Sequence, residues 1–168
     1  KGTLYGQFML TAEGPKVVEF NARFGDPEAM NTLPVLETDF VEFLTAARDG
    51  DPLPELSFAE RATVCKYAVP EGYPTDPNDG AAVAIDAESA GEAELFYASV
   101  DAREDGIYTT TSRSFAVVGI AATIADAEAI VKDAFERTGT DGLRVRHDIG
   151  TAALIEQRID HMDDLREA

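Results

Sequence analysis

Short runs of apolar, β-prone residues, separated by turn signals, dominate the start of the chain. The first two runs are residues 3–10 and 16–20, and the Ala-Glu-Gly-Pro stretch between them predicts a β-hairpin. After the hairpin, Asp26 is suited to be the N-cap of a helix and Pro27 its first residue. We therefore expect a short helix that ends at about Leu33.

A second helix is expected from Thr38 or Asp39 to Asp49, with Gly50 as its stop signal. Its predicted apolar face consists of Phe40, Val41, Phe43, Leu44 and Ala47. The Asp-Pro-Leu-Pro stretch that follows this helix indicates a linker.

The linker separates two parts of the chain. We expect residues 1–50 to form the first part, residues 51–60 the linker, and residues 61–168 a small C-terminal domain. A hairpin and one or two helices bury too little surface to be stable alone. The sheet of the first part is therefore expected to continue into chain outside this sequence.

Beyond the linker, the pattern predicts a small antiparallel α+β domain with about five strands. Strand candidates are residues 61–69, 81–85, 93–100, 107–111 and 115–121. Residues 70–80 are too rich in Pro and Gly for regular structure. Apolar residues at helical spacing predict an amphipathic helix over residues 126–138, stopped by Gly139, and a final helix over residues 152–164.

Composition indicates a globular protein. The chain has 168 residues, of which 45% are hydrophobic, and no apolar run approaches the roughly 20 residues that a membrane span needs. No secretory leader is recognisable, so we expect a cytoplasmic location and no membrane partner. The single cysteine, Cys65, cannot form an internal disulfide and is expected to be a small core residue.

The chain is strongly acidic. Its 32 acidic and 14 basic residues give a net charge of −18, which argues against a nucleic-acid partner. Only four of the basic residues are lysines, and a self-repelling surface of this kind is best tolerated in high salt. We therefore expect a halophilic protein, with an acidic mesophilic protein as the alternative. Residues 1–34 are nearly neutral, because they contain three basic and four acidic groups.

The most informative run is the decapeptide from Glu19 to Glu28. On an extended strand, Glu19, Asn21 and, if the strand continues, Arg23 point to one side. A carboxylate and an amide oxygen suit Mg²⁺, and the arginine could bind an anion through two hydrogen bonds. The alternative from these residues alone is a solvated strand end, with Asp26 and the residues after it serving only as a helix cap.

The full run E-F-N-A-R-F-G-D-P-E, preceded by L-Y-G-Q-F-M, resembles the signature of the phosphoribosylamine–glycine ligases, an ATP-grasp family. The resemblance extends weakly to residues 72–74, Arg113 and residues 146–150, and it covers the C-terminal part of the family. It implies the end of an ATP-grasp catalytic domain followed by the small α+β domain. This chain differs from the usual family residues at Thr75, at the Ser residues beside Arg113, and at Gln7. Gln7 could face the metal, but the simpler interpretation is an ordinary strand position.

The resemblance implies specific roles for the residues of this run. Glu19 and Asn21 match the Mg²⁺ or Mn²⁺ ligands that also contact ATP. Arg23 matches a cofactor-binding and catalytic residue that steadies the transferred phosphate, and Asp26 is the second expected catalytic residue. Gly25 and Glu28 match the loop near the substrates, without an assigned role.

The implied reaction is the ATP-dependent ligation of glycine to 5-phosphoribosylamine through a glycyl phosphate, in purine biosynthesis. ATP, glycine and 5-phosphoribosylamine are then the expected partners of a monomeric enzyme, and the 168-residue piece alone is expected to be inactive. The alternatives are another ATP-grasp carboxylate–amine ligase and a non-catalytic acidic interaction module.

Several other polar residues are expected to be structural. The two histidines, His147 and His161, should be solvated or locally paired, and the arginines of the C-terminal part should pair with carboxylates. These arginines are Arg144, Arg146 and Arg158.

Overall fold

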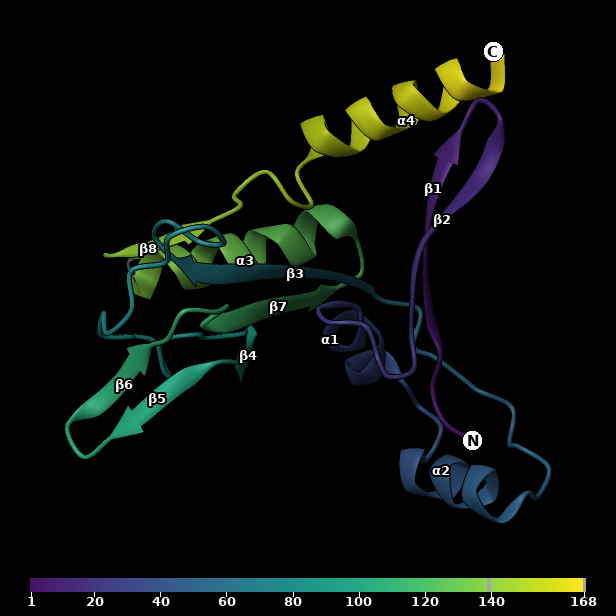
Figure 1. The fold of residues 1–168 in the computed structure, drawn as a ribbon, viewed down its shortest axis with the longest axis horizontal. Coiled ribbons are helices and arrows are strands. Elements are labelled where there is room, and N and C mark those ends of the chain that lie inside the picture. Colours follow the sequence, from purple (N-terminus) through teal and green to yellow (C-terminus); the bar gives the residue numbers. More distant parts are fainter. Residues whose placement is uncertain (139, 168) are drawn as a thin grey trace. The chain divides into compact units, whose positions relative to one another are not determined.

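The computed structural model describes residues 1–138 and 140–167, so the helix stop predicted at Gly139 lies outside the described residues. These residues form two compact units of mixed helix and antiparallel sheet (Figure 1). The first unit comprises Lys1–Glu60 together with the chain from Ile155 onward, and the second comprises Arg61–Leu154.

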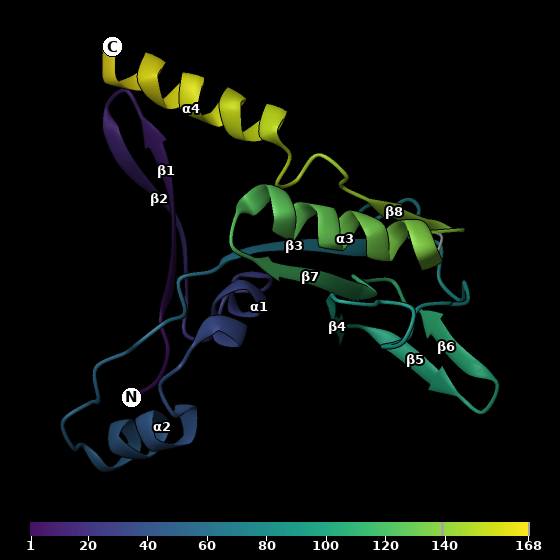
Figure 2. The ribbon, with the colours of Figure 1, turned by 180° about the vertical axis from the view of Figure 1, so that it is seen from behind.

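The first unit begins with the predicted hairpin (Figure 2). Strand β1 spans Tyr5–Thr11 and pairs antiparallel with β2, which spans Gly14–Asn21. Gly14 has a φ of 100°, a value that favours glycine, and its carbonyl accepts a hydrogen bond from Thr11 Oγ1. A bulge between Gln7 and Phe8 shifts the register midway along the pair.

Three short helical segments follow the hairpin. They are α1 (Glu28–Thr32), the 3-10 helix η1 (Leu33–Val35) and α2 (Phe40–Asp49). In α2 the Asp39 side chain accepts from the backbone N–H of Glu42, and Gly50 ends the helix in the left-handed conformation, as predicted. The predicted cap of α1 is wrong, because that helix starts one residue later than expected and its N-cap position is Pro27 instead of Asp26.

Apolar side chains of the first unit are widely exposed. None of its three helical segments before Gly50 has a buried residue, and Val41, on the expected apolar face of α2, is 72% exposed. A groove of about 280 Å³ between Phe24, Leu33, Phe40 and Phe58 is almost entirely apolar. This exposure agrees with the small size of the unit, which leaves too little chain to cover a core.

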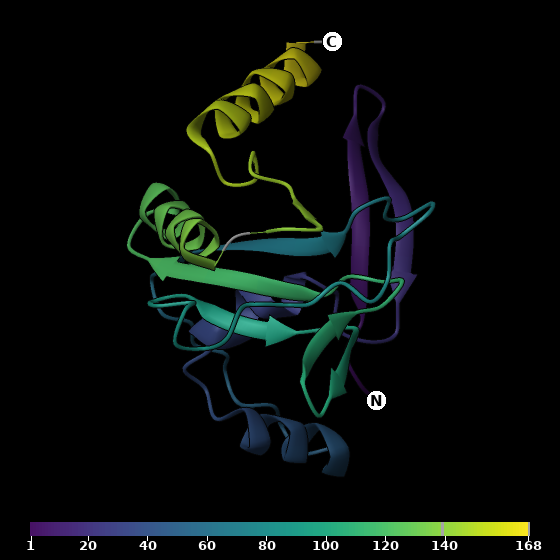
Figure 3. The same cartoon turned by 90° about the vertical axis from the view of Figure 1, so that its left-hand side faces the viewer.

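The second unit is built on a four-stranded antiparallel sheet with the strand order β4-β7-β3-β8 (Figure 3). The strands span Ala62–Pro70 (β3), Glu94–Tyr97 (β4), Phe115–Ala121 (β7) and Leu143–Val145 (β8). Helix α3, Ile124–Thr138, lies along one face of β3 and β7. The approach is close at Gly119, where a Cβ atom would collide with the carbonyl oxygen of Ala127.

A separate two-stranded ribbon consists of β5 (Val100–Arg103) and β6 (Gly106–Thr109). The strand predicted over residues 93–100 is therefore divided between β4 and β5. The strand predicted over residues 81–85 is wrong, since this segment makes only the isolated bridge between Ala82 and Tyr108.

The core of the second unit lies between the sheet and α3. It includes Phe115 and Val117 from β7 and Val131 and Phe135 from α3, and the Phe115 and Phe135 rings stack with centroids 6.0 Å apart. Cys65 is 7% exposed, as predicted for a core residue.

The last helix, α4, spans Ala152–Glu167 and is three residues longer than predicted at its C-terminal end. It has no buried residue. Among the described residues, no helix is long and apolar enough to cross a membrane.

Candidate metal and phosphate site

The register of the hairpin places four polar side chains on one face. Gln7 lies opposite Glu19, and Tyr5 lies opposite Asn21. Directly opposed residues in an antiparallel pair point to the same side of the sheet. The amide Nδ2 of Asn21 donates a 2.8 Å hydrogen bond to Glu19 Oε1. The predicted shared face of Glu19 and Asn21 is therefore confirmed, and Gln7 adds an exposed amide beside them.

The Glu19–Asn21 pair fits the ligand chemistry of a hard divalent cation. It offers a carboxylate and an amide oxygen, and Glu19 is exposed, so water or phosphate oxygens could complete the coordination. No group of three or more His, Cys, Asp and Glu side chains suited to a metal occurs in the described part of the chain. A metal at this pair would therefore depend on ligands from a bound nucleotide or from other residues.

Arg23 lies beyond the end of the strand. Strand β2 ends at Asn21 because its partner strand begins at Tyr5, so no strand residue remains opposite Arg23. The Arg23 guanidinium is exposed, and its Nη1 donates a 2.9 Å hydrogen bond to the carbonyl of Phe24. The condition for placing Arg23 on the strand face is thus not met, and this residue belongs to the loop after the strand.

The same loop is fastened to β1 by a contact that the sequence did not reveal. The Tyr5 hydroxyl donates a 2.9 Å hydrogen bond to Glu28 Oε1, the first residue of α1. Gly25 is buried between these two side chains, and a Cβ atom there would collide with the Glu28 carboxylate. Asp26 follows on the exposed part of the loop.

The charged groups of this region act on the Tyr5 hydroxyl. The pKa of Tyr5 is raised, first because its hydroxyl donates to Glu28, and further because of partial burial and the negative charges of Glu28 and Glu19. The positive charge of Arg23 acts in the opposite direction. Glu19, Arg23 and Glu28 therefore all act on the same tyrosine hydroxyl, although their chain segments differ.

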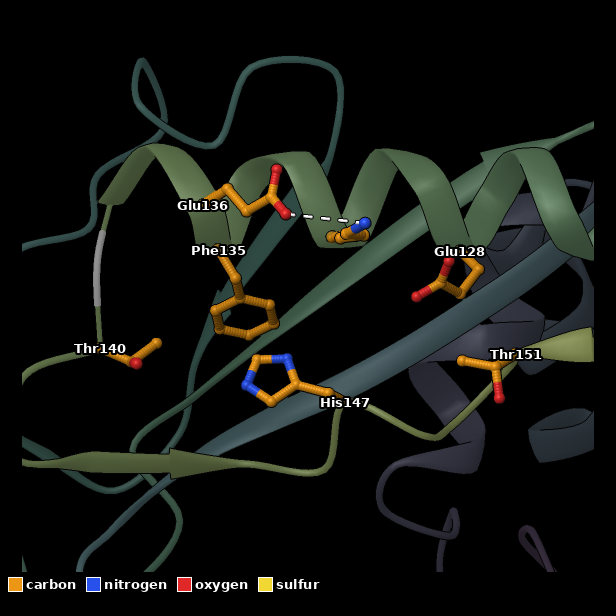
Figure 4. Close-up of a pocket in the computed structure, with 7 residues that line it drawn as sticks. Glu128, Phe135, Glu136, Thr140, His147 and Thr151 are labelled. Atoms are coloured by element: carbon orange, nitrogen blue, oxygen red, sulfur yellow. Dashed lines mark ion pairs between the residues drawn. The ribbon is translucent and has the colours of Figure 1, made fainter. Parts of the chain in front are cut away.

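The second unit contains a cavity of about 370 Å³ between α3 and the segment after β8 (Figure 4). The His147 ring meets the Phe135 ring edge to face, with centroids 6.5 Å apart. At Glu128, which lines the cavity, the carboxylate accepts a 2.7 Å hydrogen bond from the buried ammonium of Lys66. The other residues lining the cavity are Lys132, Glu136, Thr140 and Thr151.

Lys66 is a buried charged residue that was not predicted from the sequence. It is 1% exposed, and its Nζ also donates to the His147 carbonyl at 2.9 Å. The sequence around Lys66 gives no signal that this lysine is buried. Its partner Glu128 lies 62 residues further along the chain, so no local pattern connects the two. The Lys66 ammonium thus finds its acceptors inside the unit, so its role there is structural.

The arginines of the second unit have different partners. Arg146 forms two hydrogen bonds with the Asp148 carboxylate, at 2.7 and 2.6 Å, which confirms the expected pairing. Arg144 instead donates to the backbone carbonyl of Tyr73, so the expectation of a carboxylate partner is wrong there. The Arg113 guanidinium lies 4.9 Å from the centre of the Tyr67 ring.

Comparison with protein-family models finds two matches. The model described as "Phosphoribosylglycinamide synthetase, C domain" matches residues 63–152, which is more than half of the chain. The model described as "Phosphoribosylglycinamide synthetase, ATP-grasp (A) domain" matches residues 1–29, the segment that contains Glu19, Asn21 and Arg23.

Similar proteins are found among enzymes named phosphoribosylamine–glycine ligase. The phosphoribosylamine–glycine ligase of Methanosarcina barkeri is 57% identical over 168 residues, covering 99% of this chain and 38% of the relative. The enzyme of the same name from Methanosarcina acetivorans is 56% identical, with 99% and 37% coverage. The chain thus spans well under half the length of these relatives.

A solved structure resembles the fold. The crystal structure of phosphoribosylamine–glycine ligase from Thermotoga maritima matches with a TM-score of 0.70 and 23% sequence identity. The match covers 86% of this chain and 36% of that chain.

Proposed function

Since the chain belongs to the phosphoribosylglycinamide synthetase family, we propose that it is part of an enzyme that ligates glycine to 5-phosphoribosylamine while ATP is converted to ADP and phosphate. The product would be glycinamide ribonucleotide, formed in purine biosynthesis through a glycyl phosphate. The observation that carries this proposal for the chain itself is the exposed Glu19–Asn21 pair, with Arg23 on the adjoining loop.

Glu19 and Asn21 are the proposed protein ligands of Mg²⁺ or Mn²⁺ and the residues that contact the phosphates of ATP. When bound, such an ion would neutralise negative charge on the phosphate oxygens. Asn21 already directs its side chain towards the Glu19 carboxylate, so the two groups are held as neighbours before any ligand arrives.

Arg23 and Asp26 are the proposed catalytic residues of the loop. The exposed Arg23 guanidinium is suited to hold the transferred phosphoryl group through parallel hydrogen bonds, which a lysine could not form. The exposed Asp26 carboxylate suits a cationic or hydroxyl-bearing part of a substrate. Such a reaction depends on positioning and charge stabilisation and needs no protein nucleophile.

The remaining properties are proposed for the whole enzyme. We place it in the cytoplasm as a monomer, with residues 1–50 completing an ATP-grasp domain, residues 51–60 as a linker and residues 61–168 as the C-terminal domain. Its acidic composition supports adaptation to high salt.

Substitution of the proposed ligands tests the site. In the full-length polypeptide, Glu19→Gln and Asn21→Ala should each lower kcat/KM by about 10²-fold and raise the Mg²⁺ concentration needed for half-maximal activity. The measurement is ADP release that depends on both glycine and 5-phosphoribosylamine, at several Mg²⁺ concentrations.

Glu13→Gln is the matched control, because Glu13 lies at the hairpin turn and forms only an exposed ion pair with Lys16. It should retain nearly full activity. Unchanged turnover and metal requirement in both ligand variants would contradict the assignment of Glu19 and Asn21.

A further inference from the structure

The Tyr5–Glu28 hydrogen bond joins the two segments that carry the proposed site. Tyr5 is the first residue of β1 and lies opposite Asn21 in the register, on the same face as Glu19. Glu28 is the first residue of α1, at the far end of the loop that contains Arg23. The 2.9 Å bond between Tyr5 and Glu28 closes this loop against the strand pair.

At Gly25 the loop packs closely against Tyr5 and Glu28. It is buried under the Glu28 carboxylate, and a Cβ atom there would also lie 3.0 Å from Tyr5 Cδ2. The Gly25 carbonyl accepts a 2.9 Å hydrogen bond from the backbone N–H of Ala29. The tyrosine ring, the glycine and the start of α1 therefore form one packed contact at the end of the loop.

Charged groups from both segments act on the Tyr5 hydroxyl. Glu19 and Glu28 both act on it with negative charge and Arg23 with positive charge. The hydrogen bond from the Tyr5 hydroxyl fixes the position of the Glu28 carboxylate, while the Arg23 guanidinium is bonded to the Phe24 carbonyl. Tyr5 thus fastens the end of the loop that carries Arg23.

We propose that Tyr5 is a positioning residue: through Glu28, its hydroxyl holds the loop of residues 22–27 at a fixed place beside Glu19 and Asn21, so that Arg23 meets the phosphate held there. This role rests on the proposed function of the site. It assigns Glu28 and Gly25 to the support of the loop, and gives them no contact with substrate.

The test compares variants of the full-length polypeptide. Tyr5→Phe and Glu28→Ala each remove the hydrogen bond, and each should lower kcat and kcat/KM equally, by about 10- to 10²-fold, because Arg23 then no longer meets the phosphoryl group in the transition state. Glu28→Gln keeps an acceptor oxygen for the Tyr5 hydroxyl and should stay within about threefold of wild type. The double variant Tyr5→Phe/Glu28→Ala should be no worse than either single variant.

Tyr97→Phe is the matched control. The Tyr97 hydroxyl also makes one hydrogen bond, to the Ile85 carbonyl at 2.6 Å, but it lies in the second unit. Its removal should change kcat by less than about twofold. Wild-type kcat in Tyr5→Phe, or effects of Tyr5→Phe and Glu28→Ala that multiply in the double variant, would overturn the proposal.

Hydrogen exchange separates this proposal from the proposed function. The backbone N–H groups of Ala29 and Met30 donate to Gly25 and Pro27, each at 2.9 Å, so they report the closed loop without any substrate. Their exchange should be about tenfold faster in Tyr5→Phe and unchanged in Tyr97→Phe. A full-length protein that shows this exchange difference but releases no glycine-dependent ADP would contradict the proposed function alone, and unchanged exchange would overturn the role of Tyr5.

Discussion

The Arg146–Asp148 ion pair at the surface lowers a carboxyl pKa but contributes little to stability. Two short hydrogen bonds from the Arg146 guanidinium, together with its charge, lower the pKa of Asp148 from an ordinary 3.8 to about 2. A carboxyl pKa that is lower in the folded state gives stability above pH ~4, and this stability is lost as the pH falls towards 2. The side chains are 63% and 47% exposed, so the energetic effect is small.

The expected outcome of Arg146→Ala is a rise in the pKa of Asp148 towards 3.8. A carboxyl-carbon NMR titration of the folded protein measures it. Arg144→Ala is the control, because Arg144 donates to the Tyr73 carbonyl and makes no bond to Asp148. An unshifted Asp148 titration in Arg146→Ala would show that another group holds its pKa down.

At the candidate site, some features could be predicted from the sequence and others could not. The alternation of a strand is local, so the shared face of Glu19 and Asn21 follows from the sequence. The end of the strand before Arg23 depends on where β1 begins, and the Tyr5–Glu28 bond joins residues 23 positions apart. Both are tertiary facts without a local sequence signal, so only the structure reveals them.

Among the elements, α3 and β3 are joined by an ion pair between a buried lysine and a part-buried glutamate. Lys66 on β3 is 1% exposed and Glu128 on α3 is 17% exposed. Breaking such a pair leaves one charge without a partner in a poorly solvated place. The pair therefore makes the packing of α3 on the sheet sensitive to the removal of either side chain.

Lys66→Met should lower the free energy of unfolding of the second unit by about 3 kcal/mol, because Glu128 then loses its partner. The double variant Lys66→Met/Glu128→Leu should recover part of that stability, because no charge is left unpaired although the His147 carbonyl still lacks its donor. Denaturant-dependent hydrogen exchange of the β3 and α3 amides provides the measurement.

Lys132→Met serves as the control for this cycle. Lys132 is exposed on the same helix and pairs with Glu136 at 3.7 Å, so its substitution should cost less than about 0.5 kcal/mol. If Lys66→Met is no more destabilising than Lys132→Met, the buried pair does not stabilise the packing of α3.

The elements that the sequence predicted well carry strong local signals. The hairpin and α2 each have a turn or cap residue, and α3 has a clear periodicity, although it begins two residues earlier than predicted. Strand β7 was predicted with its observed bounds. Strand β8 was missed because three residues show no periodicity. The segment over residues 81–85 has strand-like residues but only one bridge, to Tyr108, and whether an edge segment pairs is decided by its neighbours in space.

For the whole molecule, net charge is the dominant physical property. A charge of −18 on 168 residues opposes compact folding through self-repulsion. Ion pairs such as Lys16–Glu13, Arg48–Asp49 and Arg103–Asp101 are exposed and therefore weak, so they offset little of it. The Debye length falls from about 10 Å at 0.1 M salt to about 3 Å at 1 M. Salt should therefore relieve most of the repulsion.

We expect the thermal midpoint to rise by on the order of 5 °C between 0.1 and 1 M NaCl. Differential scanning calorimetry measures it. A variant with Glu156→Gln, Asp160→Asn and Asp164→Asn, three exposed acidic positions on α4, should show a smaller rise. A midpoint that does not respond to salt would contradict the proposed halophilic adaptation.

Cys65, buried in β3 as the single cysteine of the chain, is also a reporter built into the second unit. Only 7% of Cys65 is exposed, so its labelling rate in the native protein should be set mainly by opening of the sheet. The first unit contains no thiol. Labelling under increasing denaturant, compared with the disappearance of helical circular dichroism, therefore distinguishes a chain whose two units melt together from one whose units melt in turn.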